Sequence, residues 1–139
     1  MTMEPRTVLI RPPAVAGLFY PAATAELAQT VNALLAAAPA ERGAAPKAII
    51  APHAGYIYSG PTAARAYALL RPLRAQIRRV VLLGPTHRVA VRGLALPDTQ
   101  IFRTPLGDVP LDAAAITELR ALPQIVVSGA AHAHEHSLE

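Results

Sequence analysis

The chain has 139 residues, of which 53% are hydrophobic and 16% charged, and its formal net charge at pH 7 is +4. This length favours a single domain, and the composition is typical of a globular protein rather than a disordered one. Cysteine is absent, which excludes disulfides, thiolate metal ligands and a catalytic thiol within this sequence.

An amphipathic helix is the first element that the sequence predicts, within the stretch 24–39. Its apolar residues recur at helical spacing: Leu27, Val31, Leu34 and Leu35. Thr24 is the expected N-cap, and Pro39 lies beyond the end. The preceding residues lack the apolar segment of a signal peptide, and no apolar run approaches membrane-spanning length. We therefore expect a cytoplasmic protein without membrane contact.

Two apolar runs, 47–51 and 79–85, are predicted to be buried strands. A second helix is predicted between them over 61–70, with Pro61 in its first turn. The order strand, helix, strand fits a right-handed crossover between parallel strands. We interpret the basic stretch 71–79 as a solvated connection, because no aromatic residues interleave it, and we expect no nucleic-acid partner.

Further elements are predicted towards the C-terminus. Residues 92–97 and 124–128 are strand candidates, and 102–110 is predicted to be a loop rich in proline and glycine. That loop leads to Asp112, a plausible N-cap for a helix. The alternation of strands and helices predicts an α/β fold.

His53 and His87 carry the main functional hypothesis. Each lies just past the end of a predicted strand and close to a proline and a glycine. Loops at the carboxyl ends of parallel strands converge, so we expect the two rings to meet. With one carboxylate they would form a site that suits Fe(II), and Zn(II) would also accept them. The alternative is that each imidazole only hydrogen-bonds its own loop, which the pairing disfavours.

The C-terminal tail alternates His132, His134 and His136, with Glu135 among them. On a strand the three histidines would share one face, and on a helix the outer two would be one turn apart. Either geometry can bind a metal, but short histidine-rich ends are often merely solvated. Periodicity does not choose between these alternatives.

Tyr56, Tyr58 and Thr86 are weaker candidates for contact with a substrate. The tyrosines can line a pocket or donate a hydrogen bond, but their alternation also suits a half-packed loop. The threonine hydroxyl can act on a substrate, or it can form a hydrogen bond within the turn that carries it. No serine lies in a nucleophile-elbow pattern and no phosphate-cradling glycine motif is present, which argues against acyl transfer and nucleotide binding.

Five stretches of the sequence resemble the Memo family, whose bacterial members are called AmmeMemoRadiSam system protein B. In chain order they are "PPAVAGLFYPA", "APHAGYIYSGPTAARAY", "VVLLGPTHRV", "FRTPLGDVPLD" and "EHSLE". The resemblance implies the fold of class III extradiol dioxygenases, an α/β/α sandwich of three layers with a mainly parallel sheet. Family members continue for about as long again, so we expect residues 1–139 to be the N-terminal half of a single domain that is truncated at the C-terminus.

The same resemblance implies roles for particular residues. His53 and His87 correspond to two metal-ligand histidines of the family. Glu135 and His136 of "EHSLE" are placed near the same crevice, where we expect them to act in catalysis or to line the pocket. The other two histidines of the tail fall outside the shared motif and are expected to be solvated.

Two functional hypotheses follow from the resemblance and the paired histidines. In the first, a divalent metal, Fe(II) before Cu or Zn, supports redox or dioxygenase-like chemistry on an unknown small molecule. In the second, the protein is a non-catalytic binding module that uses the same crevice for a peptide or protein partner. The family name implies a radical-SAM protein as the partner in bacteria.

Overall fold

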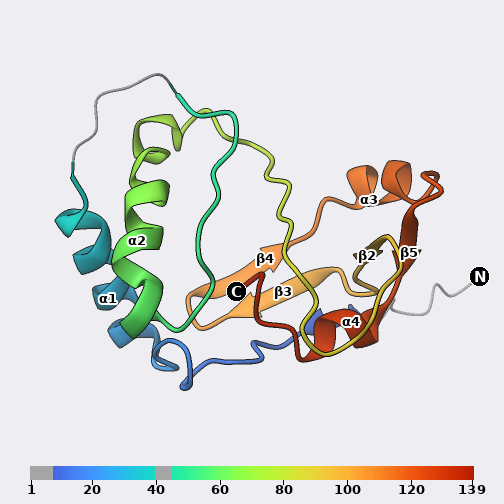
Figure 1. Cartoon of the computed structure of the whole chain (residues 1–139), viewed down its shortest axis with the longest axis horizontal. Coiled ribbons are helices and arrows are strands. Elements are labelled where there is room, and N and C mark those ends of the chain that lie inside the picture. Colours follow the sequence, from blue (N-terminus) through green and yellow to red (C-terminus); the bar gives the residue numbers. More distant parts are fainter. Residues whose placement is uncertain (1–7, 40–44) are drawn as a thin grey trace, which may run out of the picture. The chain divides into compact units, whose positions relative to one another are not determined.

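The computed structural model describes residues 8–39 and 45–139 as a mixed α/β protein (Figure 1). The chain falls into two compact units. Among the described residues, the helical unit comprises those of Val15–Pro85 and His136–Glu139, and the sheet unit comprises residues 8–14 together with Thr86–Glu135. No helix in the described ranges is both long enough and apolar enough to cross a bilayer.

The helical unit is built on α1 (Thr24–Ala37) and α2 (Tyr56–Ala68), which pack against each other, followed by the short 3-10 helix η1 (Arg71–Leu73). Leu27 is the buried residue of α1, with 3% of its surface exposed. The helix predicted within 24–39 is therefore confirmed. The predicted cap was wrong by one position, because Ala23 occupies the N-cap in an extended conformation and Thr24 is already helical.

The second helix begins earlier than the sequence predicted. Gly55 is its N-cap, so Tyr56 and Tyr58 lie in the first turn of α2 and not in a loop. Pro61 lies in the second turn, where it removes one backbone hydrogen bond instead of starting the helix.

The two apolar runs that were predicted to be buried strands are not strands. Residues 47–51 and 79–85 form no β-ladder in the described chain. Their apolar side chains are also exposed: Ile50 is 98% exposed and Val81 76% exposed. An apolar run reports a tendency to be buried, but a strand exists only where another strand pairs with its backbone.

The sheet unit holds two small sheets. In the first, β3 (Ile101–Thr104) pairs in parallel with β1 (Ile10–Arg11) and antiparallel with β4 (Gly107–Pro110). The prediction of a loop over 102–110 is therefore wrong, because this segment is mostly the β3–β4 hairpin (Figure 1). Gly107 permits the hairpin turn, since its φ of +136° is one that side-chain-bearing residues rarely adopt.

The second sheet pairs β2 (Leu94–Leu96) in parallel with β5 (Ile125–Val127). Both strands lie inside predicted strand segments. Before β5 comes α3 (Ala113–Leu119), and after it comes α4 (Gly129–Ala133). The predicted cap is confirmed, because the Asp112 carboxylate accepts a hydrogen bond from the Ala115 N–H at 2.9 Å.

Replacing Asp112 with alanine is expected to lower the free energy of unfolding by about 0.5–2 kcal/mol, because the first turn of α3 loses its side-chain acceptor. Asp112→Asn is the matched control, since asparagine caps a helix about as well as aspartate. Denaturant unfolding of the three proteins measures the difference. An alanine variant as stable as the asparagine variant would contradict the prediction.

Candidate metal centre

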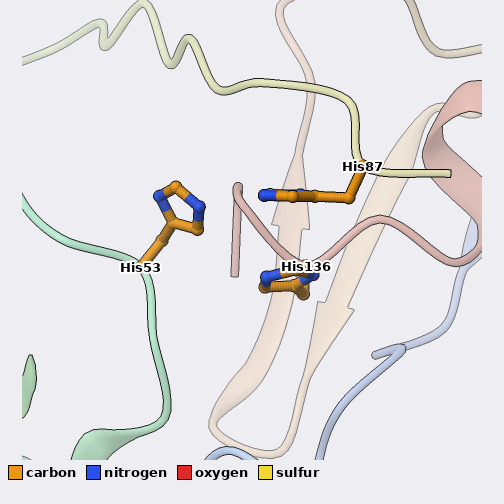
Figure 2. Close-up of side chains that lie close together, drawn as sticks. All are labelled: His53, His87 and His136. Atoms are coloured by element: carbon orange, nitrogen blue, oxygen red, sulfur yellow. The ribbon is translucent and has the colours of Figure 1, made fainter. Parts of the chain in front are cut away.

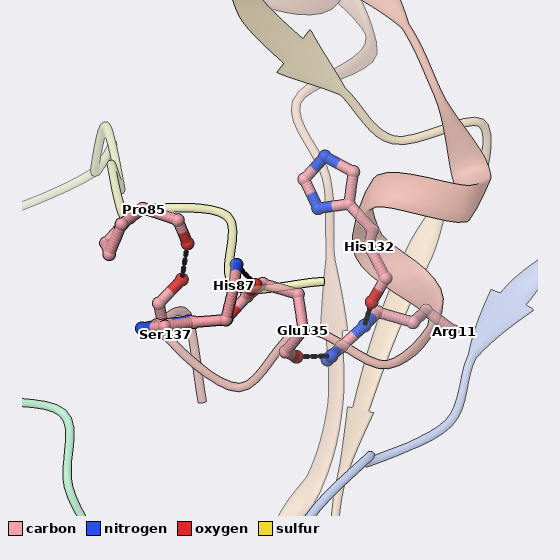
Figure 3. A network of polar contacts seen from close by, with 6 residues as sticks. All are labelled: Arg11, Pro85, His87, His132, Glu135 and Ser137. Atoms are coloured by element: carbon pink, nitrogen blue, oxygen red, sulfur yellow. Dashed lines mark hydrogen bonds and ion pairs between the residues drawn. The ribbon is translucent and has the colours of Figure 1, made fainter. Parts of the chain in front are cut away.

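His87 is held by the carboxylate of Glu135 within the sheet unit (Figure 3). The backbone N–H of His87 donates to Glu135 Oε2 at 2.6 Å, and His87 Nδ1 lies 2.8 Å from Oε1. Because a carboxylate only accepts hydrogen bonds, Nδ1 carries the ring proton, and Nε2 keeps the lone pair that a metal requires. Glu135 is 5% exposed and His87 is 40% exposed. A buried carboxylate thus orients an imidazole that ions can reach.

His136 lies beside His53 and Phe19 in the helical unit. The ring centroids of the two histidines are 5.5 Å apart, and the Phe19 ring meets His136 edge-on at 4.8 Å. All three line an open cleft of about 570 Å³. The other residues that line this cleft are mostly apolar: Leu18, Pro52, Ala54, Gly55, Ile57 and Tyr58. Two imidazoles are therefore presented on an otherwise apolar surface.

The loop that carries His53 is tied to the start of α2. The Ser59 hydroxyl donates to the carbonyl oxygen of Ala54 at 2.8 Å. The Tyr56 N–H donates to the carbonyl oxygen of Phe19, also at 2.8 Å. These bonds keep His53 next to Phe19 without any regular strand before it.

Two short segments of the chain are joined by hydrogen bonds at both ends (Figure 3). The Ser137 hydroxyl donates to the carbonyl oxygen of Pro85 at 2.8 Å. His87, two residues after Pro85, is held by Glu135, which lies two residues before Ser137. His136 lies between Glu135 and Ser137 in the sequence, so these bonds hold the residues on either side of it.

His53, His87 and His136 together could hold a metal ion. Each offers one imidazole nitrogen, and these nitrogens all lie within 4.8 Å of one another. The three rings come from three different loops (Figure 2). Nitrogens bound to one ion at about 2.1 Å each are at most about 4.2 Å apart, which is close to the limit that the three rings meet here. The donor set itself fits, since neutral imidazoles bind iron, copper and zinc.

The remaining predicted site residues lie in different surroundings. Tyr58 is 83% exposed and lines the cleft. Tyr56 packs against Tyr20, with ring centroids 5.6 Å apart, and its burial, together with the nearby Tyr67, raises the pKa of its phenol. Thr86 is exposed on the segment that leads to His87.

The alternating histidines of the tail do not act as a group. His132 is buried in α4, where its Nε2 donates to the carbonyl oxygen of Ala95 at 3.0 Å and its ring meets Phe102 edge-on. The prediction that it is solvated was therefore wrong, because α4 packs this ring into the sheet unit. His134 is exposed, as expected. His136 shares neither a strand face nor a helical turn with them, since α4 ends before it.

Sequence reasoning missed two contributors to the site. Arg11 is 4% exposed and donates to main-chain oxygens in the segment that precedes His136. Glu139 accepts a hydrogen bond from the Tyr20 hydroxyl at 2.6 Å, which ties the end of the tail to the helical unit. Both contacts join residues more than a hundred positions apart, so no local pattern signalled them.

The described chain is a mixed α/β protein with a cluster of three histidines that could hold a metal ion. The family model for Memo-like proteins matches residues 11–139. The chain therefore belongs to the Memo-like protein family.

Relatives in several lineages support this membership. A MEMO1 family protein of Ignicoccus hospitalis is 41% identical over 143 residues, covering 95% of this chain and 50% of the relative. One from Aquifex aeolicus is 40% identical over 131 residues, covering 94% of this chain and 47% of the relative. The protein MEMO1 of Xenopus laevis is 42% identical over 104 residues, covering 75% and 34% respectively. The chain thus spans about half the length of the first two of these relatives.

Proposed function

We propose that the protein binds one divalent transition metal ion through His53, His87 and His136. The observation that supports this most directly is the spacing of the three imidazole nitrogens, within 4.8 Å of one another. Its second support is Glu135, which sets the tautomer of His87 as outer-shell carboxylates do for metal-bound histidines. Fe(II) is the metal we propose first, with copper and zinc as the alternatives.

The proposed activity is redox or dioxygenase-like chemistry on a small molecule. A bound transition metal would supply Lewis acidity and, for iron or copper, electron transfer. The side chains of this chain would position the ligands and the substrate. Glu135 keeps a proton on His87 Nδ1, while Phe19 and Tyr58 offer an apolar surface against which a substrate can lie. In this proposal Glu135 is a positioning residue and His136 a ligand, and the catalytic roles expected for them stay predictions.

The test is an anaerobic Fe(II) titration of the full-length protein and of its His53→Ala and His87→Ala variants. We expect one ion to bind to the unsubstituted protein. Each variant should bind it at least about 100-fold more weakly, because loss of even an outer-shell partner costs 10- to 100-fold in affinity. Equal affinity in all three proteins would reject the proposal.

A second candidate function is non-catalytic binding of a peptide or protein partner in the same cleft. The observation that favours it is the exposure of apolar residues there, with Leu18 81% and Ile57 85% exposed. Oxygen uptake by the metal-loaded protein, over a panel of catechols and other small reductants, separates the two functions. Oxygen uptake with any of these compounds supports the enzyme, and no uptake with all of them supports the binding module.

The finer fold and the protein partner are also proposals. The parallel pairs β1–β3 and β2–β5 and the family membership support a three-layer sandwich with a mainly parallel sheet, in which residues 1–139 form part of one Memo-like domain. A radical-SAM protein is the partner that the resemblance suggests. Its capture by the tagged full-length protein, in an amount that survives salt washing, would support that suggestion.

A further inference from the structure

Arg11 is a buried arginine in the sheet unit, on the short strand β1. Only 4% of its surface is exposed. Arginine is almost never fully buried unless its guanidinium is paired, because removing the charge from water costs several kcal/mol. The contacts that offset this cost therefore indicate what the residue does.

The guanidinium of Arg11 holds the main chain at the end of α4 (Figure 3). Its Nε donates to the carbonyl oxygen of His132 at 2.7 Å, and its Nη2 donates to the carbonyl oxygen of Glu135. The carbonyl oxygen of His132 also accepts the Glu135 N–H at 3.3 Å, so it belongs to the turn that follows α4. Arg11 thus fixes the point at which the chain leaves α4.

The sheet itself supports this arginine. Arg11 lies opposite Phe102 in the parallel β1–β3 register. Its guanidinium carbon lies 4.9 Å from the centre of the Phe102 ring, which is within the range of a cation–π contact. The aromatic face therefore restricts the guanidinium to the orientation in which it reaches both carbonyls.

The contact with Glu135 connects Arg11 to the histidine cluster. Arg11 holds the main chain of Glu135, and the carboxylate of the same residue accepts hydrogen bonds from the backbone N–H and Nδ1 of His87. We propose that Arg11 is a positioning residue for the metal centre, which acts through Glu135 to hold His87 in the Nδ1–H tautomer with Nε2 available to a metal. The metal-binding part of this inference rests on the proposed function.

The first measurement needs no metal. Nitrogen-15 NMR of the full-length protein, at a pH where the imidazoles are neutral, reports which ring nitrogen of His87 carries the proton. We expect the Nδ1–H form to dominate in the unsubstituted protein and to lose that dominance in Arg11→Met. Arg11→Lys should lie between the two, because an ammonium keeps the charge but not the two-pronged geometry. Arg103→Met is the matched control, since Arg103 is an exposed arginine of the same sheet that pairs with Asp108.

The second measurement is the Co(II) affinity of the same proteins. We expect a 10- to 100-fold loss in Arg11→Met, a smaller loss in Arg11→Lys and no change in Arg103→Met. If the unsubstituted protein binds no metal, the proposed function fails, while the NMR measurement still decides the role of Arg11. A folded Arg11→Met variant with the original tautomer would overturn the inference.

A double-mutant cycle covers the case in which Arg11→Met does not fold. Arg11→Lys and Glu135→Gln are then measured singly and together, with the His87 tautomer as the readout. Residues that act through one network have non-additive effects, so a combined effect no larger than that of Glu135→Gln alone supports the inference. Additive effects would overturn it.

Discussion

Replacing His136 with alanine is expected to lower the metal affinity of the protein at least about 100-fold. The substitution removes one of three imidazoles whose nitrogens lie within 4.8 Å of one another. Two imidazoles leave the ion held more weakly and with little selectivity, and the loss should exceed the 10- to 100-fold that an outer-shell change produces. Co(II) titration followed by visible absorption measures both the affinity and the change in coordination.

His134→Ala is the matched control for this experiment. His134 is two residues away, is exposed and lies outside the cluster of three histidines. The control variant should bind Co(II) as the unsubstituted protein does and show the same spectrum. If the two variants lost affinity equally, the tail would contribute only its general histidine content, and His136 would not be a ligand.

Replacing Gly93 with alanine is expected to destabilise the sheet unit by about 3 kcal/mol or more. The φ of Gly93 is +97°, and a left-handed conformation costs a residue with a side chain about 1–3 kcal/mol. A Cβ at this position would also collide with the carbonyl oxygen of Gln124. That collision falls where the Leu94 N–H donates to the same carbonyl at 2.9 Å, next to the β2–β5 pairing.

Gly107→Ala separates the two causes. Gly107 also has a positive φ, +136°, but a Cβ there would meet no atom within 4 Å. Its alanine variant should therefore show the backbone cost without the collision, and it should be clearly more stable than Gly93→Ala. Denaturant unfolding measures both variants. Equal losses of unfolding free energy would mean that the contact with Gln124 adds nothing.

Local patterns were sufficient for several elements. The spacing of apolar residues predicted α1, and the Asp112 cap marked the start of α3, because helix periodicity and capping involve residues only a few positions apart. The strand segments that contain β2 and β5 were also predicted. The chain motifs around His53 and His87 identified two members of the histidine cluster and the family to which the chain belongs.

The geometric reason for expecting His53 and His87 to meet was wrong, although both belong to the histidine cluster. His53 and His87 do not follow strands of one parallel sheet, since 47–51 and 79–85 are not strands. Each histidine is positioned instead through bonds that its own loop makes, to the start of α2 in one case and to Glu135 in the other.

The sequence by itself determined the family, the principal helices and the presence of histidines in loops that can bind a metal. The resemblance had placed His136 near the crevice, and the tertiary structure added that its ring nitrogen clusters with those of His53 and His87. Only the tertiary structure decided that His132 is buried and that Glu135 orients His87. It also decided the role of Arg11, which bonds to a carbonyl 121 positions away. The physical reason is that helix periods and caps depend on neighbouring residues, whereas hydrogen bonds between distant segments exist only after the chain has folded.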